Sequence, residues 1–259
     1  MCGRYVMARA LGDLVADAGA VEPKEELALR PNWNVAPTSE VPIVLDRATE
    51  TGDRREIHVA RWGLVPPWAK DTAVGSRAFN ARSETVSTKP TFRAAVKARR
   101  AAIPADGYYE WLKPPAGAPK GTPKRPFFVR PADGSLIYFA GLYEWWKDPE
   151  RADDDPARWL LSCTILTGPS PETGTGTGTG DTTLEQLAGL HDRLPLPMDR
   201  DTMDTWLNPE KQASADEAET LVEQVRNQAY QTASAWTLTE VGTAVGNVRN
   251  NGPELVQGL

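Results

Sequence analysis

The chain has 259 residues, of which 40% are hydrophobic and 25% charged, so one large domain or two small ones with a sizeable core are possible. Its formal net charge of −6 argues against a protein that coats nucleic acid without specificity, although an acidic body can still carry a local basic groove. Asp13 and Asp17 interrupt the first apolar run, so neither a secretory leader nor a membrane span is predicted, and we expect a cytoplasmic protein.

The chain begins MCGRY, which places a cysteine directly after the initiator methionine. Removal of Met1 would leave Cys2 with a free α-amine beside its thiol. An aldehyde reacts with such an aminothiol through an imine, to which the thiolate adds to close a thiazolidine ring. With ordinary pKa values of about 8 for the amine and ~8.5 for the thiol, nearby acid–base groups would help at neutral pH. The plainer interpretation is a small buried side chain near a tethered N-terminus.

The elements that follow are mostly short strands. Leu11, Leu14, Val15 and Ala18 repeat at helical spacing and predict a short amphipathic helix. Apolar runs separated by Pro, Gly and Asp clusters then predict strands: VPIVL, IHVARWG, AAIPADGYYEW, PFFVR, LIYFAGLYEW and WLLSCTIL. Later, ADEAETLVEQVRNQ predicts an exposed amphipathic helix, and AWTLTEVGTAVGNVRN is again strand-like. Cys163 lies in the last apolar run, where we expect an inert core residue.

These elements predict an α+β fold. We expect one strand-dominated domain over residues 2–259, with a curved mixed sheet or open barrel flanked by short helices. Three stretches have the composition of surface insertions, at residues 113–125, 147–158 and 170–181. The Thr-Gly repeat in the third has nothing to bury and predicts a mobile loop. The two cysteines do not make a structural zinc site or an expected disulfide, and we expect no metal or cofactor.

Four polar stretches stand out against their apolar flanks. They are RWGLVPPWAK with Trp62 and Trp68, RAFNARSET with Arg77, Asn80 and Arg82, ADGYYEW with Glu110 and Trp111, and LHDRLPLPM with His191 and Arg193. Each side chain also has an ordinary structural explanation, such as a core tryptophan, a turn cap or a solvated strand residue. Spacing alone does not bring the four stretches together.

Taken in order, the motifs identify a family. MCGRY, NVAPT, RWGLVPPWAKD, FNARSET, DGYYEW, FAGLYEWW, ILTGPS, HDRLPLPM and AVGNVRNNGPELV together resemble the SOS response-associated peptidase (SRAP) proteins, which shield abasic sites in DNA. The resemblance runs from residue 2 almost to the end of the chain, and the three insertions are its departures. Leu194 stands where methionine is common, which is a conservative apolar change.

The resemblance implies roles for individual residues. Cys2 matches the crosslinking nucleophile after Met1 removal, and Asn80 matches an active-site asparagine. Glu110 and His191 match the acidic and histidine positions of the G-[YWF]-[YWF]-E-W and H-D-R-x-P motifs. The positions that fall where the family contacts single-stranded DNA are Arg4, Trp68, Arg82, Trp111 and Arg193.

The residue chemistry agrees with these roles. A histidine can exchange a proton with the sugar O4′ at neutral pH, and a glutamate can shuttle protons during imine formation and ring closure. Arginines would hold phosphates while tryptophans stack on bases without regard to sequence. The cations that we expect to form a local basic groove are Arg4, Arg77, Arg82, Arg93, Lys97, Arg99, Arg100 and Arg193.

The leading hypothesis is therefore an enzyme that crosslinks to abasic sites in single-stranded DNA through Cys2. We expect a monomer without a membrane partner, which associates with the nucleoid when it is bound to damaged DNA. One alternative is a thiol peptidase with Cys2 as nucleophile and His191 as base. The other alternative is a non-catalytic nucleic-acid-binding module, which would not need Glu110 and His191 beside the N-terminus.

Overall fold

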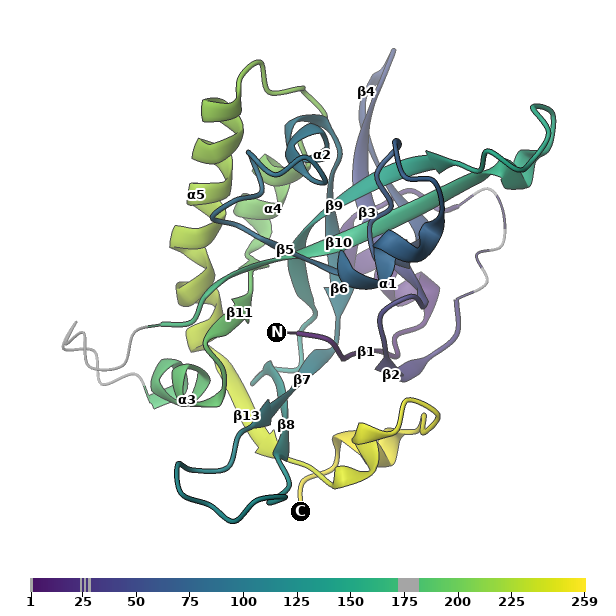
Figure 1. Ribbon diagram of the computed structural model, residues 1–259. Helices are drawn as coiled ribbons and strands as arrows, with labels where there is room; N and C mark the ends of the chain where they lie inside the picture. Colours follow the sequence, from purple (N-terminus) through teal and green to yellow (C-terminus); the bar gives the residue numbers. More distant parts are fainter. Residues whose placement is uncertain (1, 24, 26, 28, 172–181) are drawn as a thin grey trace.

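A five-stranded barrel forms the centre of the protein (Figure 1). The computed structural model describes residues 2–259 except 24, 26, 28 and 172–181. The barrel strands, in spatial order, are β10 (Trp159–Pro169), β4 (Gly52–Trp62), β3 (Glu40–Thr49), β6 (Arg100–Ala105) and β9 (Ile137–Lys147). Pairing of β9 with β10 closes the ring, and only the short β10–β4 contact in it is parallel. Closure removes the unpaired edges that an open sheet would expose.

A second sheet lies beside the barrel and carries the N-terminal segment. Its strands, in spatial order, are β13 (Trp236–Glu240), β8 (Arg125–Pro131), β7 (Gly107–Leu112), β1 (Tyr5–Met7) and β2 (Asn32–Val35). Three short strands extend the barrel sheet, namely β5 (Asn80–Arg82), β11 (Arg193–Pro195) and β12 (Pro197–Met198). The two sheets meet at the N-terminal segment, where Asn80 at the start of β5 hydrogen-bonds to the carbonyl of Cys2, just before β1.

Five α-helices flank the sheets in the described part of the chain. They are α1 (Leu11–Ala18), α2 (Arg93–Ala98), α3 (Thr182–Leu190), α4 (Arg200–Leu207) and α5 (Ala215–Ser234). The 3-10 turns are η1 (Thr72–Arg77), η2 (Pro156–Arg158), η3 (Thr243–Gly246) and η4 (Pro253–Val256). Ser214 caps the start of the long helix α5, and its hydroxyl accepts a hydrogen bond from the Glu217 N–H. Among the described residues, no helix is long and apolar enough to cross a membrane.

The α+β, strand-dominated architecture is confirmed, and two predicted elements are corrected. The predicted strand over residues 101–111 is two strands, β6 in the barrel and β7 in the second sheet, which are separated at Asp106. The Asp106 carboxylate accepts hydrogen bonds from the Ala8 N–H and the Arg9 side chain, which fixes the bend. The predicted strand over 235–250 ends at Glu240, and η3 and a turn follow. Cys163 is fully buried on β10, as predicted.

The proposed insertions lie between strands or beyond β10. Residues 113–124 connect β7 to β8, and 148–158 join β9 to β10 at the end of an arm that extends away from the barrel (Figure 1). Most of the third stretch, including the Thr-Gly repeat, lies outside the described residues. The mobility that the repeat predicts stays a prediction.

Candidate active site at the N-terminal cysteine

Four separate elements bring Cys2, Asn80, Glu110 and His191 to the junction of the two sheets. Cys2 immediately precedes β1, Asn80 begins β5, Glu110 lies on β7, and His191 follows the last residue of α3. The side chains therefore come from four segments that are far apart in sequence. Their grouping depends on the fold rather than on local structure.

Asn80 holds the backbone of Cys2. Its Nδ2 donates a hydrogen bond to the Cys2 carbonyl oxygen at 2.7 Å. Asn80 is itself positioned by parallel pairing of β5 with β10, in which it lies opposite Ile165. Its Oδ1 is buried and accepts no hydrogen bond from any described residue. A buried acceptor without a donor costs free energy, so this oxygen is available to a group that arrives with the substrate or with the processed N-terminus.

The register of β1 with β7 places Glu110 beside Cys2. Tyr5 lies opposite Tyr108, and the Tyr109 N–H donates to the Arg4 carbonyl at 2.9 Å. Continuing this antiparallel register places Glu110 opposite the residue that follows Cys2. The Glu110 side chain is buried, and its Oε1 accepts a hydrogen bond from the Trp111 N–H at 3.2 Å.

Burial controls the ionisation of the cysteine. Cys2 is completely buried, and this desolvation raises the pKa of its thiol far above the ordinary value. The negative charge of Glu110 raises the thiol pKa further. The thiol is therefore protonated at neutral pH and needs a base to become a nucleophile.

His191 lies near the same carboxylate and is neutral at neutral pH. Desolvation lowers the pKa of its imidazole below the ordinary value of 6.5, against the opposing effect of Glu110. Its Nδ1 accepts a hydrogen bond from the Arg193 N–H at 2.9 Å, which leaves the proton on Nε2. Asp192 Oδ1 also lies 2.8 Å from Nδ1, a contact that suits a protonated ring. The backbone N–H decides the tautomer, because the Asp192 side chain is 82% exposed and its carboxylate is hydrated.

Two of the predicted DNA contacts, Arg4 and Trp111, lie together next to Cys2. The Arg4 guanidinium lies 5.8 Å from the centre of the Trp111 ring. It also donates hydrogen bonds of 2.8 Å to Asn34 Oδ1 and to the Val245 carbonyl. Asn34 Nδ2 in turn donates to the carbonyls of three residues between 245 and 250. Arg4 therefore links the N-terminal segment to the C-terminal turns.

The arginines of the FNARSET and HDRLPLPM stretches are also close to each other. Arg193 forms a salt bridge with Glu84 and donates a hydrogen bond of 2.6 Å to the Thr167 carbonyl. This bridge lowers the pKa of the Glu84 carboxylate to about 2. Arg193 is thus paired within the protein, whereas Arg77 and Arg82 are exposed.

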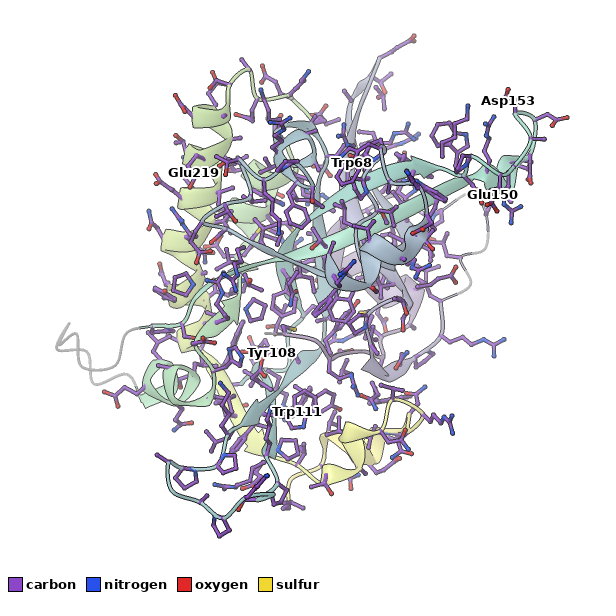
Figure 2. The ribbon with its side chains drawn as sticks, in the orientation of Figure 1. Trp68, Tyr108, Trp111, Glu150, Asp153 and Glu219 are labelled. Carbon is purple, nitrogen blue, oxygen red and sulfur yellow. The ribbon has the colours of Figure 1, made fainter. Side chains whose placement is uncertain are left out.

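Trp68 is separated from the rest of the set. It is 62% exposed in the loop between β4 and η1, and Figure 2 shows it far from Trp111, with Tyr108 between the two. The loop is fixed to the barrel where the Trp146 Nε1–H donates to the Ala69 carbonyl at 2.8 Å.

The expected basic groove is smaller than the sequence predicts. Arg100 is buried, and its guanidinium donates to five backbone carbonyls near α2 and α4. Arg99 pairs with the buried Glu144 at 2.8 Å. Arg100 therefore stabilises the fold and is not a groove residue, which corrects the prediction for this side chain.

Sequence reasoning missed several polar groups around the site. Asn34 and the hydroxyls of Tyr5 and Tyr108 were not singled out, although all three lie within the NVAPT, MCGRY and DGYYEW motifs. Membership in these motifs was the signal that could have found them. Within the described residues, no group of three or more His, Cys, Asp or Glu side chains is arranged to hold a metal ion.

Comparisons with known proteins extend these observations. A sequence model of the family "SOS response associated peptidase (SRAP)" matches residues 1–248. The chain is 32% identical over 257 residues to "Abasic site processing protein YoqW" of Bacillus subtilis (strain 168), with 99% of each chain covered. It is 26% identical to "Abasic site processing protein HMCES" of Xenopus tropicalis, covering 89% of this chain and 67% of that protein. A crystal structure of a protein from Bacteroides thetaiotaomicron matches with a TM-score of 0.72 at 19% identity, covering 100% of both chains, and supports the same fold.

Proposed function

The chain belongs to the SOS response associated peptidase family, and from this membership we propose that it captures abasic sites in single-stranded DNA as a covalent crosslink. After removal of Met1, Cys2 would supply both its α-amine and its thiol, and the product would be a thiazolidine. Three kinds of support agree, namely the names of the relatives, the chemistry of an N-terminal cysteine and the grouping of acid–base residues around it.

The contact between Asn80 and Cys2 carries the proposal. The Asn80 amide nitrogen holds the Cys2 carbonyl at 2.7 Å, and its buried oxygen has no donor among the described residues. The missing donor in this interpretation is the α-amine of the processed Cys2. An amide that is hydrogen-bonded to both the carbonyl and the amine of Cys2 would fix the direction in which the amine attacks the aldehyde carbon. Such positioning raises the reaction rate, because the reacting groups are already oriented.

The capture begins with opening of the sugar. The protonated form of His191, which is the minor form at neutral pH, gives a proton to O4′ as the bond between C1′ and O4′ breaks. The C1′ hydroxyl loses its own proton to water at the same time, and C1′ becomes an aldehyde carbon. The Cys2 amine adds to this carbon to give a carbinolamine, which loses water to form an iminium ion. Glu110, buried beside the cysteine, is placed to move protons in both steps.

Ring closure completes the crosslink. The Cys2 thiol gives its proton to the Glu110 carboxylate, and the resulting thiolate adds to the iminium carbon. A carbon–sulfur bond forms while the carbon–nitrogen π electrons return to nitrogen. Because burial and Glu110 both raise the pKa of the thiol, this deprotonation is the step that most needs a base in contact.

Intact mass spectrometry with a uracil-excised single-stranded oligonucleotide tests the proposal. We expect the processed protein to gain the mass of the oligonucleotide less one water. Cys2→Ala should give no adduct, and neither should protein that retains Met1 or carries an acetylated α-amine with the thiol intact. A stable adduct on the blocked protein would contradict the thiazolidine chemistry. DNA binding without any adduct would instead support a non-catalytic binding module.

A further inference from the structure

A tyrosine hydroxyl near the capture site lacks the hydrogen bond that burial normally demands. Tyr5 is completely buried on β1, and its hydroxyl has no hydrogen-bond partner among the described residues. Its ring packs edge-on against Trp62, with ring centres 5.1 Å apart. A phenylalanine would make the same ring contact without burying an unsatisfied polar group, so the hydroxyl calls for a functional explanation.

A second tyrosine lies directly across from the first. β1 and β7 pair in register with Tyr5 opposite Tyr108, so the two side chains lie on the same face of the sheet. Tyr108 is also buried. Its ring packs edge-on against the rings of Phe139 and Trp236, with ring centres 5.9 Å apart in both pairs. Both rings are therefore fixed by aromatic neighbours, and in Figure 2 Tyr108 lies in the middle of the protein, beside the N-terminal segment.

Both tyrosines lie in the same buried hydrophobic cluster as Cys2. Burial raises the pKa of Tyr5 well above its ordinary value, with further contributions from the thiols of Cys163 and Cys2. Burial likewise raises the pKa of Tyr108, with further contributions from Cys2 and Glu110. Each hydroxyl therefore keeps its proton across the neutral range and acts as a hydrogen-bond donor.

We propose that the hydroxyls of Tyr5 and Tyr108 form a pair of donors that stabilises the Cys2 sulfur while it carries negative charge during ring closure. The inference rests on the proposed function and concerns a single step of it. When the thiol proton moves to Glu110, the sulfur becomes an anion in a buried site beside another carboxylate. Preorganised neutral donors are the arrangement that stabilises such a charge without reorganisation.

The Tyr5 hydroxyl, which has no hydrogen-bond partner among the described residues, fits the role of a donor to the thiolate. A neutral thiol is a weak acceptor, so the hydroxyl gains little from it before deprotonation, whereas a thiolate accepts a charge-assisted hydrogen bond. The donor is thus used only when the charge develops. Interactions that are stronger in the transition state than in the ground state are those that accelerate a reaction.

Two conservative variants, Tyr5→Phe and Tyr108→Phe, test the proposal. Loss of one hydrogen bond to a charged group predicts ring closure about 10- to 100-fold slower in each variant. Imine formation uses only the amine, so trapping of the imine with cyanoborohydride should proceed at the wild-type rate, and imine should accumulate in single-turnover reactions. Tyr5→Phe should also raise the melting temperature, because it removes an unsatisfied buried hydroxyl.

Tyr138→Phe is the matched control. Tyr138 is a buried tyrosine of β9 whose hydroxyl donates to Asp17 at 2.6 Å, on the face of the barrel covered by α1. Its variant should lower the melting temperature and leave the crosslinking rate unchanged. Cys163→Ala should also leave the rate unchanged, which separates the Cys2 thiol from the other thiol near Tyr5.

The outcomes separate this inference from the proposed function. If Tyr5→Phe and Tyr108→Phe both close the ring at the wild-type rate, the donor pair is wrong while the Cys2 crosslink stands. If the variants slow imine trapping as much as ring closure, the hydroxyls act before the sulfur does, and the inference is likewise overturned. If the wild-type protein forms no adduct, the proposed function itself fails.

Discussion

His191 and Glu110 have different surroundings, and the proposed mechanism gives them different steps. His191 is half-buried and has a lowered pKa, so its neutral form predominates at neutral pH. Glu110 is buried near Cys2, which would carry both the amine and the thiol. The first would act on the sugar and the second on the bonds to Cys2.

We predict that His191→Ala slows crosslinking to a natural abasic site but leaves capture of a simple open-chain aldehyde nearly unchanged. Glu110→Gln should slow both substrates, because each must pass through the carbinolamine. Acid–base assistance is worth about 10²–10⁴-fold, which single-turnover assays resolve. Equal slowing of both aldehydes in the His191 variant would place His191 in the imine or ring-closing step.

The pH profile gives an independent check on His191. Because burial lowers its pKa, the inflection in rate should lie below 6.5 and disappear in His191→Ala. The folded protein also binds fewer protons than the unfolded chain between this lowered pKa and 6.5. Stability should therefore fall as the pH drops through that range, and His191→Ala should reduce this loss.

For single residues, the sequence indicates which side chains are candidates for the site better than it indicates which residues they contact. Cys2, Asn80, Glu110 and His191 were singled out by residue type and by the family motifs, and the structure brings them to one junction of the two sheets. The hydrogen bonds of Arg4 were not predicted, because its partners Asn34 and Val245 lie 30 and 241 residues away in the sequence. A hydrogen bond between distant segments leaves no local trace in the sequence.

Among the elements, the loop that carries Trp68 depends on two glycines at its base. Gly63 adopts a φ of +134°, which side chains other than glycine rarely allow. A Cβ on Gly75 would lie 2.5 Å from the Gly63 carbonyl oxygen. The two backbones therefore touch, and this contact closes the loop beneath Trp68.

We predict that Gly75→Ala lowers the free energy of unfolding by about 1–3 kcal/mol, because the added methyl group forces the two backbones apart. Gly12→Ala in α1 is the control, since a Cβ there meets nothing within 4 Å and alanine favours a helix. Denaturant unfolding of both variants measures the effect. Equal free energies of unfolding for Gly75→Ala and the wild type would contradict the prediction, because they would show that the loop accommodates the methyl group without loss of stability.

Element prediction succeeded where the pattern was local. The helix at residues 11–18 and most strands follow from apolar spacing. The run over 101–111 contains an Asp-Gly pair at 106 and 107, a common turn signal that the prediction of a single strand passed over. Asp106 divides it through bonds to Ala8 and Arg9, which arrive from the N-terminal segment. Helices α3 and α4 were not predicted, although they are no shorter than α1, and in the structure they pack against α5 and the sheets.

At the scale of the whole molecule, the acidic net charge opposes the binding of DNA. Trp68 and Arg82 are exposed, the first in the loop after β4 and the second on β5. The net charge of −6 opposes long-range attraction of DNA. On the proposed function, DNA binding has to come from local contacts to phosphates and bases.

We predict that Trp68→Ala and Arg82→Ala each weaken capture on single strands by about 1–3 kcal/mol, and that affinity falls as salt rises. Trp159→Ala is the control, because Trp159 is 50% exposed on the distant arm. Fluorescence anisotropy with single- and double-stranded oligonucleotides measures both effects. Equal binding of the two forms with no salt dependence would contradict a single-strand groove.

The closed barrel shows how far pattern reasoning extends to the whole molecule. The sequence predicts many short strands and a curved sheet or open barrel, and it leaves the closure undecided. Closure comes from pairing of β9 with β10 together with a two-residue parallel contact between β10 and β4. Such a contact joins strands about 100 residues apart and has no periodicity of its own.

The position of β1 between β2 and β7 also has a consequence for the order of events during synthesis. Cys2 is completely buried, and β1 has its β7 partner only once residues 107 and 108 have left the ribosome. At about 5–20 residues per second, the chain start then stays exposed for roughly 5–20 s. On the proposed function, an aminopeptidase that needs an unfolded chain start would have to remove Met1 within this interval, whereas self-cleavage would have no such limit. In the first case the rate of translation would decide what fraction of the protein carries a free Cys2 amine.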